Sequence, residues 1–231
     1  MTTLNNTDSA DREIRVILAS ASPARLKLLT SAGISADVYV SNVDEESITA
    51  ILASEGRSDP ADIAQSLAIA KAVVVADELR SEFSREHTTV IIGCDSVLNL
   101  EGSALGKPLD EADAVQRWRR MRGRTAQLCT GHAVIVLGET EDDDQVAKAV
   151  AATVVQFAAI DDETIHRYVQ TGEPLNVAGA FTIDGLGGPF VEFIEGDWSN
   201  VVGLSLPLLR HLVSELGIGW YELWAATSKN A

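Results

Sequence analysis

Apolar and polar positions along the chain follow two alternating patterns. Runs in which apolar residues cluster or alternate predict strands at residues 15–19, 37–43, 88–94, 125–137 and 150–157. Segments in which apolar residues recur every three or four positions predict helices at residues 24–32, 60–83, 110–122, 161–170 and 204–216. Residues 178–193 are rich in glycine and apolar side chains, and we expect irregular chain with short strands there. Because strands alternate with helices, the pattern favours an α/β domain with a mixed sheet.

Residues with special backbone preferences mark the ends of these elements. Ser58-Asp59-Pro60 is a strong helix start, since proline is favoured at the first helical position. Gly33, Gly123 and Gly172 follow predicted helices, where glycine is well suited to the turn that ends a helix. The acidic segment 139–144 separates two predicted strands, so we expect it to be the loop of an antiparallel hairpin.

The chain is long enough for one sizeable core. It has 231 residues, 46% of them apolar, which is ordinary for a single α/β domain. Residues 1–12 are polar and acidic, and we expect them to be a disordered leader. We expect residues 13–226 to form one domain, since no repeat or low-complexity linker divides them.

The charge balance excludes two classes of partner. The formal net charge is −16, with 34 acidic residues against 18 basic ones. Non-specific nucleic-acid binding needs a surface of lysine and arginine, and anionic membranes attract basic patches, so we expect neither partner. A substrate that carries phosphates would need cations gathered locally against this overall field.

We expect neither a targeting signal nor a membrane-spanning segment in this chain. Its N-terminus lacks the basic and apolar regions of a signal peptide, and no apolar stretch reaches the length of a transmembrane helix. Cys94 and Cys129 lie in apolar runs without a CxxC partner, which indicates buried, reduced thiols. We therefore expect a cytoplasmic protein.

The first candidate site lies at a predicted helix start. Ser20, Ser22 and Pro23 join the strand at 15–19 to the next helix, and Arg25 lies in that helix's first turn. A helix N-terminus presents free N–H groups and a partial positive charge to a phosphate, and the hydroxyls and guanidinium would add donors. Such a pattern is also common where a serine only caps a helix, so both alternatives remain open.

The second candidate is Asp95, which directly follows the apolar run 90–94. Open α/β sheets build their sites at the carboxyl ends of strands, which is where we expect this carboxylate. It could deprotonate a water or hold a metal. Capping of the following loop is the structural alternative.

Two further segments could serve a phosphorylated ligand. Gly106-Lys107-Pro108 is not a P-loop, because the spacing from Gly102 is one residue short and proline replaces the metal-binding hydroxyl. Lys107 could still contact a phosphate as a point charge, although a solvated lysine is more common. Asp44-Glu45-Glu46 is typical of a solvated loop, but these carboxylates could also bind Mg²⁺ together with substrate phosphates.

Other features favour structural roles. Segment 117–124 holds five arginines, and we interpret it as a basic helix end with Trp118 and Met121 facing the core. Gly185-Leu186-Gly187-Gly188 is not a dinucleotide fingerprint, because Phe190 breaks the pattern and no helix follows. The four histidines, at positions 87, 132, 166 and 211, lack metal-ligand spacing.

Each of these features is weak alone, but their order and spacing resemble the Maf family of nucleotide pyrophosphatases, first named for septum inhibition. The resemblance extends from Ile17 to about Leu209. Its motifs are Leu18-Ala19-Ser20-Ala21-Ser22-Pro23-Ala24-Arg25, Val43-Asp44-Glu45-Glu46, Ala70-Lys71-Ala72, Gly93-Cys94-Asp95-Ser96, Gly106-Lys107-Pro108, Thr130-Gly131, Gly172-Glu173-Pro174, Ala178-Gly179-Ala180-Phe181, Gly185-Leu186-Gly187-Gly188 and Asn200-Val201-Val202-Gly203-Leu204.

The resemblance implies a fold, a reaction and an assembly. The fold would be a mixed α/β structure of the Maf/ITPase type, with an elongated central sheet, flanking helices and a cleft between two lobes. The reaction would be hydrolysis of an acid anhydride, in which a ribo- or deoxyribonucleoside triphosphate, including modified ones, yields the monophosphate and pyrophosphate through metal-assisted water attack at the α-phosphorus. Members commonly form homodimers.

The resemblance also implies residue roles. Asp95 would be the general base or a metal-linked carboxylate, and Glu45 would help to hold Mg²⁺ or Mn²⁺. The triphosphate would be held by Ser20, Ser22, Arg25, Lys71 and Lys107.

Three positions depart from the commonest family pattern, and in the family they track base choice. Ala24 stands where many members have arginine, Ser96 where many have threonine, and Asp184 where many have glutamine. An amide both donates and accepts, whereas a carboxylate only accepts. Asp184 therefore favours a base edge that donates, which puts a thymidine or uridine preference in doubt.

Two other functions compete with this one. A nucleotide-binding regulator of cell division would bind without turnover, and it would not need Asp95, Lys71, Lys107 and Glu45 together. A different α/β hydrolase of phosphate esters would release orthophosphate rather than pyrophosphate.

Overall fold

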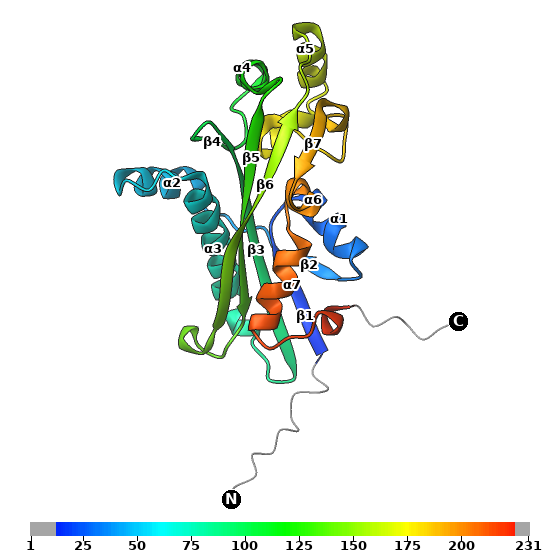
Figure 1. Cartoon of the computed structure of the whole chain (residues 1–231). Helices are drawn as coiled ribbons and strands as arrows, with labels where there is room; N and C mark the ends of the chain where they lie inside the picture. Colours follow the sequence, from blue (N-terminus) through cyan, green and yellow to red (C-terminus); the bar gives the residue numbers. More distant parts are fainter. Residues whose placement is uncertain (1–12, 225–231) are drawn as a thin grey trace, which may run out of the picture.

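One long mixed sheet runs through the computed structural model, which describes residues 13–224 (Figure 1). Its strands are β1 (Glu13–Ala19), β2 (Ala36–Val38), β3 (His87–Leu100), β4 (Ser103–Leu105), β5 (Thr125–Val136), β6 (Gln145–Phe157) and β7 (Val191–Glu195). The order is β2-β1-β3-β5-β6-β7, with β4 paired to β3. β1 is parallel to β2 and β3, whereas the β3–β5, β5–β6 and β6–β7 pairs are antiparallel.

Helices cover both faces and one end of this sheet (Figure 1). They are α1 (Pro23–Ser31), α2 (Glu45–Ser54), α3 (Pro60–Leu79), α4 (Glu111–Met121), α5 (Asp162–Gln170), α6 (Trp198–Val202) and α7 (Leu206–Glu215). α3 packs along β3 and β5 on one face, and α1 and α7 cover the other. α4 and α5 lie together at the far end, where their side chains share a core with the last residues of β3.

Side chains of the central strands are buried on both faces, as an apolar run predicts. On β1, Val16 and Leu18 pack against α1 and α7, whereas Ile17 packs against α3. At the far end, Trp118 lies edge-on to Phe157 and Tyr168, with ring centroids 5.6 and 5.5 Å away.

Two glycines let α3 approach the sheet unusually closely. A Cβ at Gly93 of β3 would lie 2.3 Å from the carbonyl oxygen of Ala68, and one at Gly131 of β5 would lie 2.3 Å from that of Ala64. Only glycine is compatible with this separation. Lys71 follows Ala68 by three residues and so projects from the same side of α3 toward the sheet.

The structure confirms the α/β architecture with a mixed sheet but changes several boundaries. β3 continues six residues beyond the predicted end at Cys94, because its pairing with β5 continues through polar positions that interrupt the apolar pattern. The strand predicted at 37–43 is only Ala36–Val38. Neither α2 nor α6 was predicted, since an acidic run and a five-residue helix give weak periodic signals.

Some expectations lie beyond these observations. The predicted leader, residues 1–12, and residues 225–226 of the predicted domain lie outside the described residues. The cleft between two lobes stays a prediction. Within residues 13–224, none of the helices combines the length and apolar character needed to cross a bilayer.

Candidate active site

The candidate site lies where β1 separates from β3. Parallel pairing of these strands ends at Ala19 and Gly93, and the same edge of β3 is next paired from Leu98 onward, by β4. Asp95 therefore lies within a strand rather than at its carboxyl end, contrary to the sequence-based prediction. It nevertheless lies just past the end of the parallel pair, where that strand edge has no neighbouring strand among the described residues. The side chain is therefore at a break in the sheet.

Arg25 occupies this break. It is 8% exposed, and Nη1 donates to Ser20 Oγ at 2.9 Å and to the Cys94 carbonyl at 2.8 Å. Nη2 donates to Ser96 Oγ at 3.0 Å, and Nε donates to the Gly203 carbonyl at 2.7 Å. These bonds use four of the five N–H donors of a guanidinium. Arg25 thus joins four segments, and its fifth N–H makes no hydrogen bond among residues 13–224.

The serines before α1 take part in the same arrangement. Ser22 caps α1 by accepting from the Arg25 amide at 3.4 Å, which is the structural alternative that the sequence left open. Ser20 is buried, and its hydroxyl accepts from the Ser22 amide at 3.2 Å as well as from Arg25. Phosphate binding by these serines stays a prediction.

Lys71 links the two carboxylates that the sequence singled out. Its Nζ lies 2.5 Å from Asp95 Oδ1 and 2.6 Å from Glu45 Oε1. The side chains of Lys71 and Asp95 are 11% and 13% exposed, whereas that of Glu45, in the first turn of α2, is 44% exposed. Asp44 caps α2, accepting from the Ser47 amide at 2.9 Å, and so places Glu45 over the lysine. The acidic run is a helix start rather than a loop.

Burial and two neighbouring cations have opposite effects on the pKa of Asp95. Burial raises the pKa of the Asp95 carboxyl, and the positive charges of Lys71 and Arg25 oppose that rise. A carboxylate with a raised pKa is a stronger base than one in water. By contrast, burial raises the pKa of the neighbouring Cys94 thiol to about 11, so this group stays protonated and is no nucleophile at neutral pH.

The carboxylates present suit a magnesium-type cation only together with a substrate. Glu45 and Asp95 could provide oxygen ligands, but Lys71 lies between them. Among residues 13–224 there is no group of three or more histidine, cysteine, aspartate and glutamate side chains arranged for a metal. Mg²⁺ commonly takes one or two carboxylates and completes its shell with phosphate oxygens and water. The donor set therefore fits a cation that arrives with a nucleotide.

The remaining predicted residues lie on exposed chain. Lys107 is exposed in the connection between β4 and α4, and Asp184 is exposed in the segment between α5 and β7. Gly106, next to Lys107, accepts at its carbonyl from Arg117 Nη1 at 2.6 Å and from the Gly179 amide at 3.1 Å. The Lys107 connection and the Asp184 segment are therefore joined to each other. Within residues 13–224 neither side chain is hydrogen-bonded or ion-paired to Asp95.

Two residues were assigned no site role from the sequence, although Thr130 lies in the Thr130-Gly131 motif. Thr130 is fully buried on β5 opposite Ser96, and the two hydroxyls lie 2.9 Å apart. A threonine inside an apolar strand was the available signal. Arg117 was interpreted as part of a basic helix end, yet it holds the Gly106 carbonyl. The interpretation is confirmed for Trp118 and Met121, which are both fully buried.

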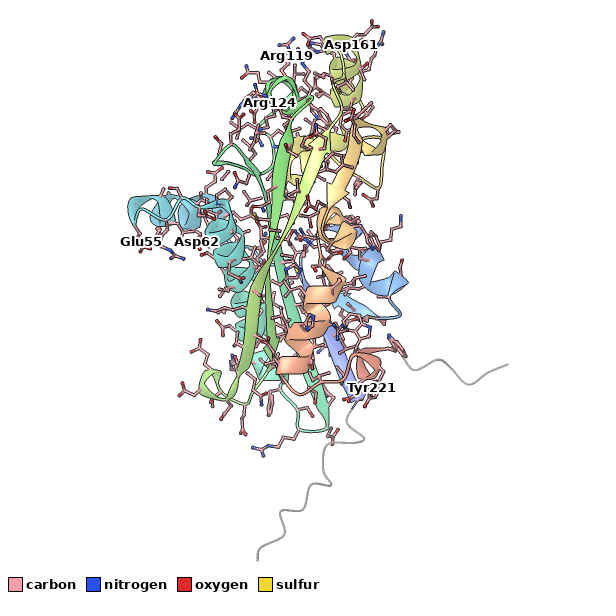
Figure 2. The ribbon with its side chains drawn as sticks, in the orientation of Figure 1. Glu55, Asp62, Arg119, Arg124, Asp161 and Tyr221 are labelled. Atoms are coloured by element: carbon pink, nitrogen blue, oxygen red, sulfur yellow. The ribbon has the colours of Figure 1, made fainter. Side chains whose placement is uncertain are left out.

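Three of the other four arginines of that segment form ion pairs at the surface. Arg119 and Arg122 contact Asp162 at 2.8 and 2.7 Å, and Arg124 contacts Glu101 at 2.7 Å. Figure 2 places Arg119, Arg124 and Asp161 at the far end of the molecule. These contacts pair Arg119, Arg122 and Arg124 with neighbouring carboxylates.

A separate hollow lies between α1 and α7 and is lined by ten residues: Ser31, Ala32, Gly33, Trp198, Ser199, Leu206, Pro207, Arg210, Trp220 and Trp224. None of the predicted site residues lines it. The candidate site at Asp95 is therefore separate from this hollow.

Comparison with known proteins agrees with the motifs. Residues 15–216 match the family model described as Maf-like protein. A protein of Salinispora tropica named nucleoside triphosphate pyrophosphatase is 51% identical over 217 residues, covering 94% of this chain and 90% of its own. A protein of Streptomyces coelicolor with the same name is 51% identical, covering 91% and 95%. One from Cyanothece sp., again with this name, is 46% identical and is covered over its whole length, against 91% of this chain.

Proposed function

The chain belongs to the Maf family, and from that membership we propose that it is a nucleoside triphosphate pyrophosphatase. It is a hydrolase that acts on a nucleotide anhydride, releasing the nucleoside monophosphate and pyrophosphate. Relatives at 46–51% identity that carry this name support the activity. The observation that carries the proposal for this chain is the buried Asp95 carboxylate, held 2.5 Å from Lys71 at the break in the sheet.

Asp95 acts as the general base. Its carboxylate takes a proton from a water whose oxygen attacks the α-phosphorus. The new bond joins the water oxygen to phosphorus, and the bond that breaks joins phosphorus to the oxygen bridging the α and β phosphates. That bridging oxygen leaves with pyrophosphate, and Asp95 returns its proton to solvent. General-base catalysis of this kind contributes about 10²–10⁴ in rate.

Lys71 orients the base and keeps it ionised. A cation 2.5 Å from Asp95 Oδ1 favours the charged carboxylate and fixes the direction of its other oxygen. The second contact, to Glu45 Oε1 at 2.6 Å, fixes the lysine in turn. As the α-phosphate gains negative charge in the transition state, the same ammonium stabilises it.

The phosphates lie at the start of α1. Ser20, Ser22 and the N–H groups of the first turn face them, and Arg25 offers its one remaining N–H. Lys107 contacts the triphosphate as a point charge. Because the chain carries a net charge of −16, binding depends on this local group of cations.

A divalent cation, Mg²⁺ or Mn²⁺, completes the site. Glu45 and Asp95 would hold it together with phosphate oxygens, and it would supply neutralisation of the charge that develops on the phosphates. Two carboxylates alone do not fill the coordination shell of such a cation, which supports its binding as a complex with the nucleotide.

The base is read by Ala24, Ser96 and Asp184. Asp184 is exposed, and an ionised carboxylate only accepts hydrogen bonds, so it selects a base edge that donates. Family resemblance further supports a homodimer in the cytoplasm.

A product assay tests this function. Purified protein is given a panel of standard and modified nucleoside triphosphates with Mg²⁺ or Mn²⁺, and monophosphate, pyrophosphate and orthophosphate are quantified. We expect pyrophosphate, with a kcat at least about 10²-fold lower for Asp95→Asn. Asp142→Asn, which removes an exposed carboxylate from the β5–β6 hairpin, is the matched control and should keep full activity.

The other outcomes identify the competing functions. Nucleotide binding without turnover would replace the enzyme with a regulator. Orthophosphate as the first product would indicate a different phosphohydrolase.

A further inference from the structure

The side chain of Glu173 lies at the centre of a hydrogen-bonded turn. Its Oε1 accepts from Tyr168 Oη at 3.0 Å, from the Gly187 amide at 3.0 Å and from the Thr182 hydroxyl. Its Oε2 accepts from the Leu186 amide at 2.9 Å. All four donors are neutral, and two of them are backbone amides of the chain that follows. An ionised carboxylate is an acceptor at every lone pair, so it can satisfy all four at once.

The glycines of this segment allow the chain to wrap around that carboxylate. A Cβ at Gly185 would lie 2.5 Å from Glu173 Oε2, and one at Gly187 would lie 2.4 Å from Tyr168 Oη. At Gly187 a Cβ would also lie 2.6 Å from the Thr182 carbonyl oxygen, so a larger residue there requires the turn to shift. The glycine-rich run that did not fit a dinucleotide motif is therefore explained by close approach to a carboxylate.

Asp184 lies between the two points at which this turn is held. Thr182, two residues before it, and Leu186, two residues after it, both donate to Glu173. The Asp184 side chain itself is exposed. Its backbone is thus held on both sides by hydrogen bonds to one carboxylate, while its own side chain is exposed to a ligand.

The turn is also fixed relative to the candidate active site. Trp118 Nε1 donates to the Ala180 carbonyl at 2.7 Å, and the Gly179 amide donates to the Gly106 carbonyl at 3.1 Å. Ala180 shares a hydrophobic core with Leu98, which lies on β3 three residues beyond Asp95. The position of Asp184 is therefore defined with respect to β3 and to the Lys107 connection.

We propose that Glu173 is a positioning residue for base selection, which sets the direction of Asp184 by holding the turn 182–187 on its carboxylate. The inference rests on the proposed function, because it assumes that Asp184 reads the base. Hydrogen bonds from Thr182, Leu186, Gly187 and Tyr168 outweigh burial and lower the pKa of Glu173, so the carboxylate stays an acceptor at neutral pH.

Glu173→Gln tests the inference, because an amide group brings an N–H toward one of the four donors. Affinities are measured by calorimetry for nucleoside triphosphate analogues with a non-hydrolysable α,β-methylene bridge, one for each common base. We expect the ratio between the strongest and weakest binders to fall about tenfold in Glu173→Gln. Glu173→Asp, which keeps an acceptor-only group, should retain part of the ratio.

Two controls separate positioning from a general structural effect. Glu192→Gln removes an exposed carboxylate from β7 and should leave the ratio unchanged. In an Asp184→Ala background, Glu173→Gln should cause no further change in the ratio, since Glu173 acts through Asp184. Hydrogen exchange should show faster exchange of the Leu186 and Gly187 amides in Glu173→Gln. If Glu173→Gln does not fold, Thr182→Val can replace it. This variant removes one of the four donors, so it should lower the affinity ratio by less than the roughly tenfold change expected for Glu173→Gln.

The inference and the function fail in different ways. The positioning role would be overturned if Glu173→Gln made the turn exchange faster but left the affinity ratio unchanged. It would also be overturned if Glu173→Gln lowered the ratio by the same factor in the Asp184→Ala background as in wild type. A wild-type protein that binds every base equally would overturn it too. Absence of pyrophosphate release from hydrolysable nucleotides would overturn the proposed function, whereas the affinity ratios would still decide the role of Glu173.

Discussion

At the scale of single residues, the site is built from buried groups whose charges and hydrogen bonds depend on one another. The positive charge of Lys71 opposes the rise that burial causes in the pKa of Asp95, and Arg25 uses most of its N–H donors to join segments of the chain. Lys71 and Arg25 therefore hold the site together and also set its charge. We expect replacement of either cation to change the pKa of Asp95 as well as the rate.

The pH dependence of activity should report the Asp95–Lys71 contact. Because burial raises the pKa of Asp95, the acidic limb of kcat/KM should lie above the ordinary value of 3.8. Lys71→Gln removes a cation that opposes this rise. The acidic limb of kcat/KM in this variant should therefore lie about 1–3 pH units above that of wild type. Lys27→Gln, at an exposed position of α1, is the control. Equal limbs for wild type and Lys71→Gln, at constant saturating metal, would show that Lys71 does not tune Asp95.

His132 should make stability depend on pH. It is fully buried, with Nδ1 3.0 Å from the Thr130 carbonyl oxygen and Nε2 accepting from the Ser205 amide at 2.9 Å. Burial lowers its pKa from 6.5 to about 4, so between these values the unfolded chain binds more protons than the folded one. Stability should therefore fall as pH falls from 6.5 to 4, by about 3 kcal/mol from this group. Urea unfolding should show a smaller pH slope in His132→Gln, and an identical slope would count against a neutral buried histidine.

At the scale of elements, the site depends on how closely helices approach the sheet. The glycines at positions 93 and 131 bring α3 down so that Lys71 reaches Asp95. At the far end, α4 holds the connection that carries Lys107: Arg117 donates to the Gly106 carbonyl, and Asp113 Oδ2 accepts from the Leu109 amide at 3.0 Å. The helix thus fixes both sides of the lysine.

Removal of the Arg117 contact should weaken substrate binding more than the chemical step. Arg117→Ala frees the Gly106 carbonyl, so Lys107 would be ordered only on binding, and KM should rise about tenfold with a smaller change in kcat. Arg119→Ala, on the exposed side of the same helix, is the matched control and should leave KM unchanged. A fall in kcat at constant KM would place Arg117 in the chemistry instead.

At the scale of the whole molecule, the alternation of strands and helices was sufficient to predict the mixed α/β sheet. The extension of β3 past Asp95 was not predictable in this way, because Asp95, Ser96 and Asn99 interrupt the apolar pattern while pairing with β5 continues. α2 was missed because Asp44-Glu45-Glu46 resembles a solvated loop, although an aspartate cap followed by acids is also a helix start.

Family motifs pointed to candidate site residues that periodicity could not, and the structure shows why. Arg25, Lys71 and Asp95 are brought together from three elements far apart in the sequence. Glu173 lies in the Gly172-Glu173-Pro174 motif but was assigned no role, since its hydrogen-bond donors come from the turn after it. Contacts of this kind depend on tertiary structure and not on local pattern.

The central claim is that Asp95 directs a water to the α-phosphorus. Hydrolysis in ¹⁸O-labelled water, followed by mass spectrometry of both products, tests it most directly. The account predicts that the label enters the nucleoside monophosphate, that pyrophosphate stays unlabelled, and that Asp95→Asn slows this labelling by at least about 10²-fold. Label in pyrophosphate, or equal labelling rates for wild type and Asp95→Asn, would contradict it.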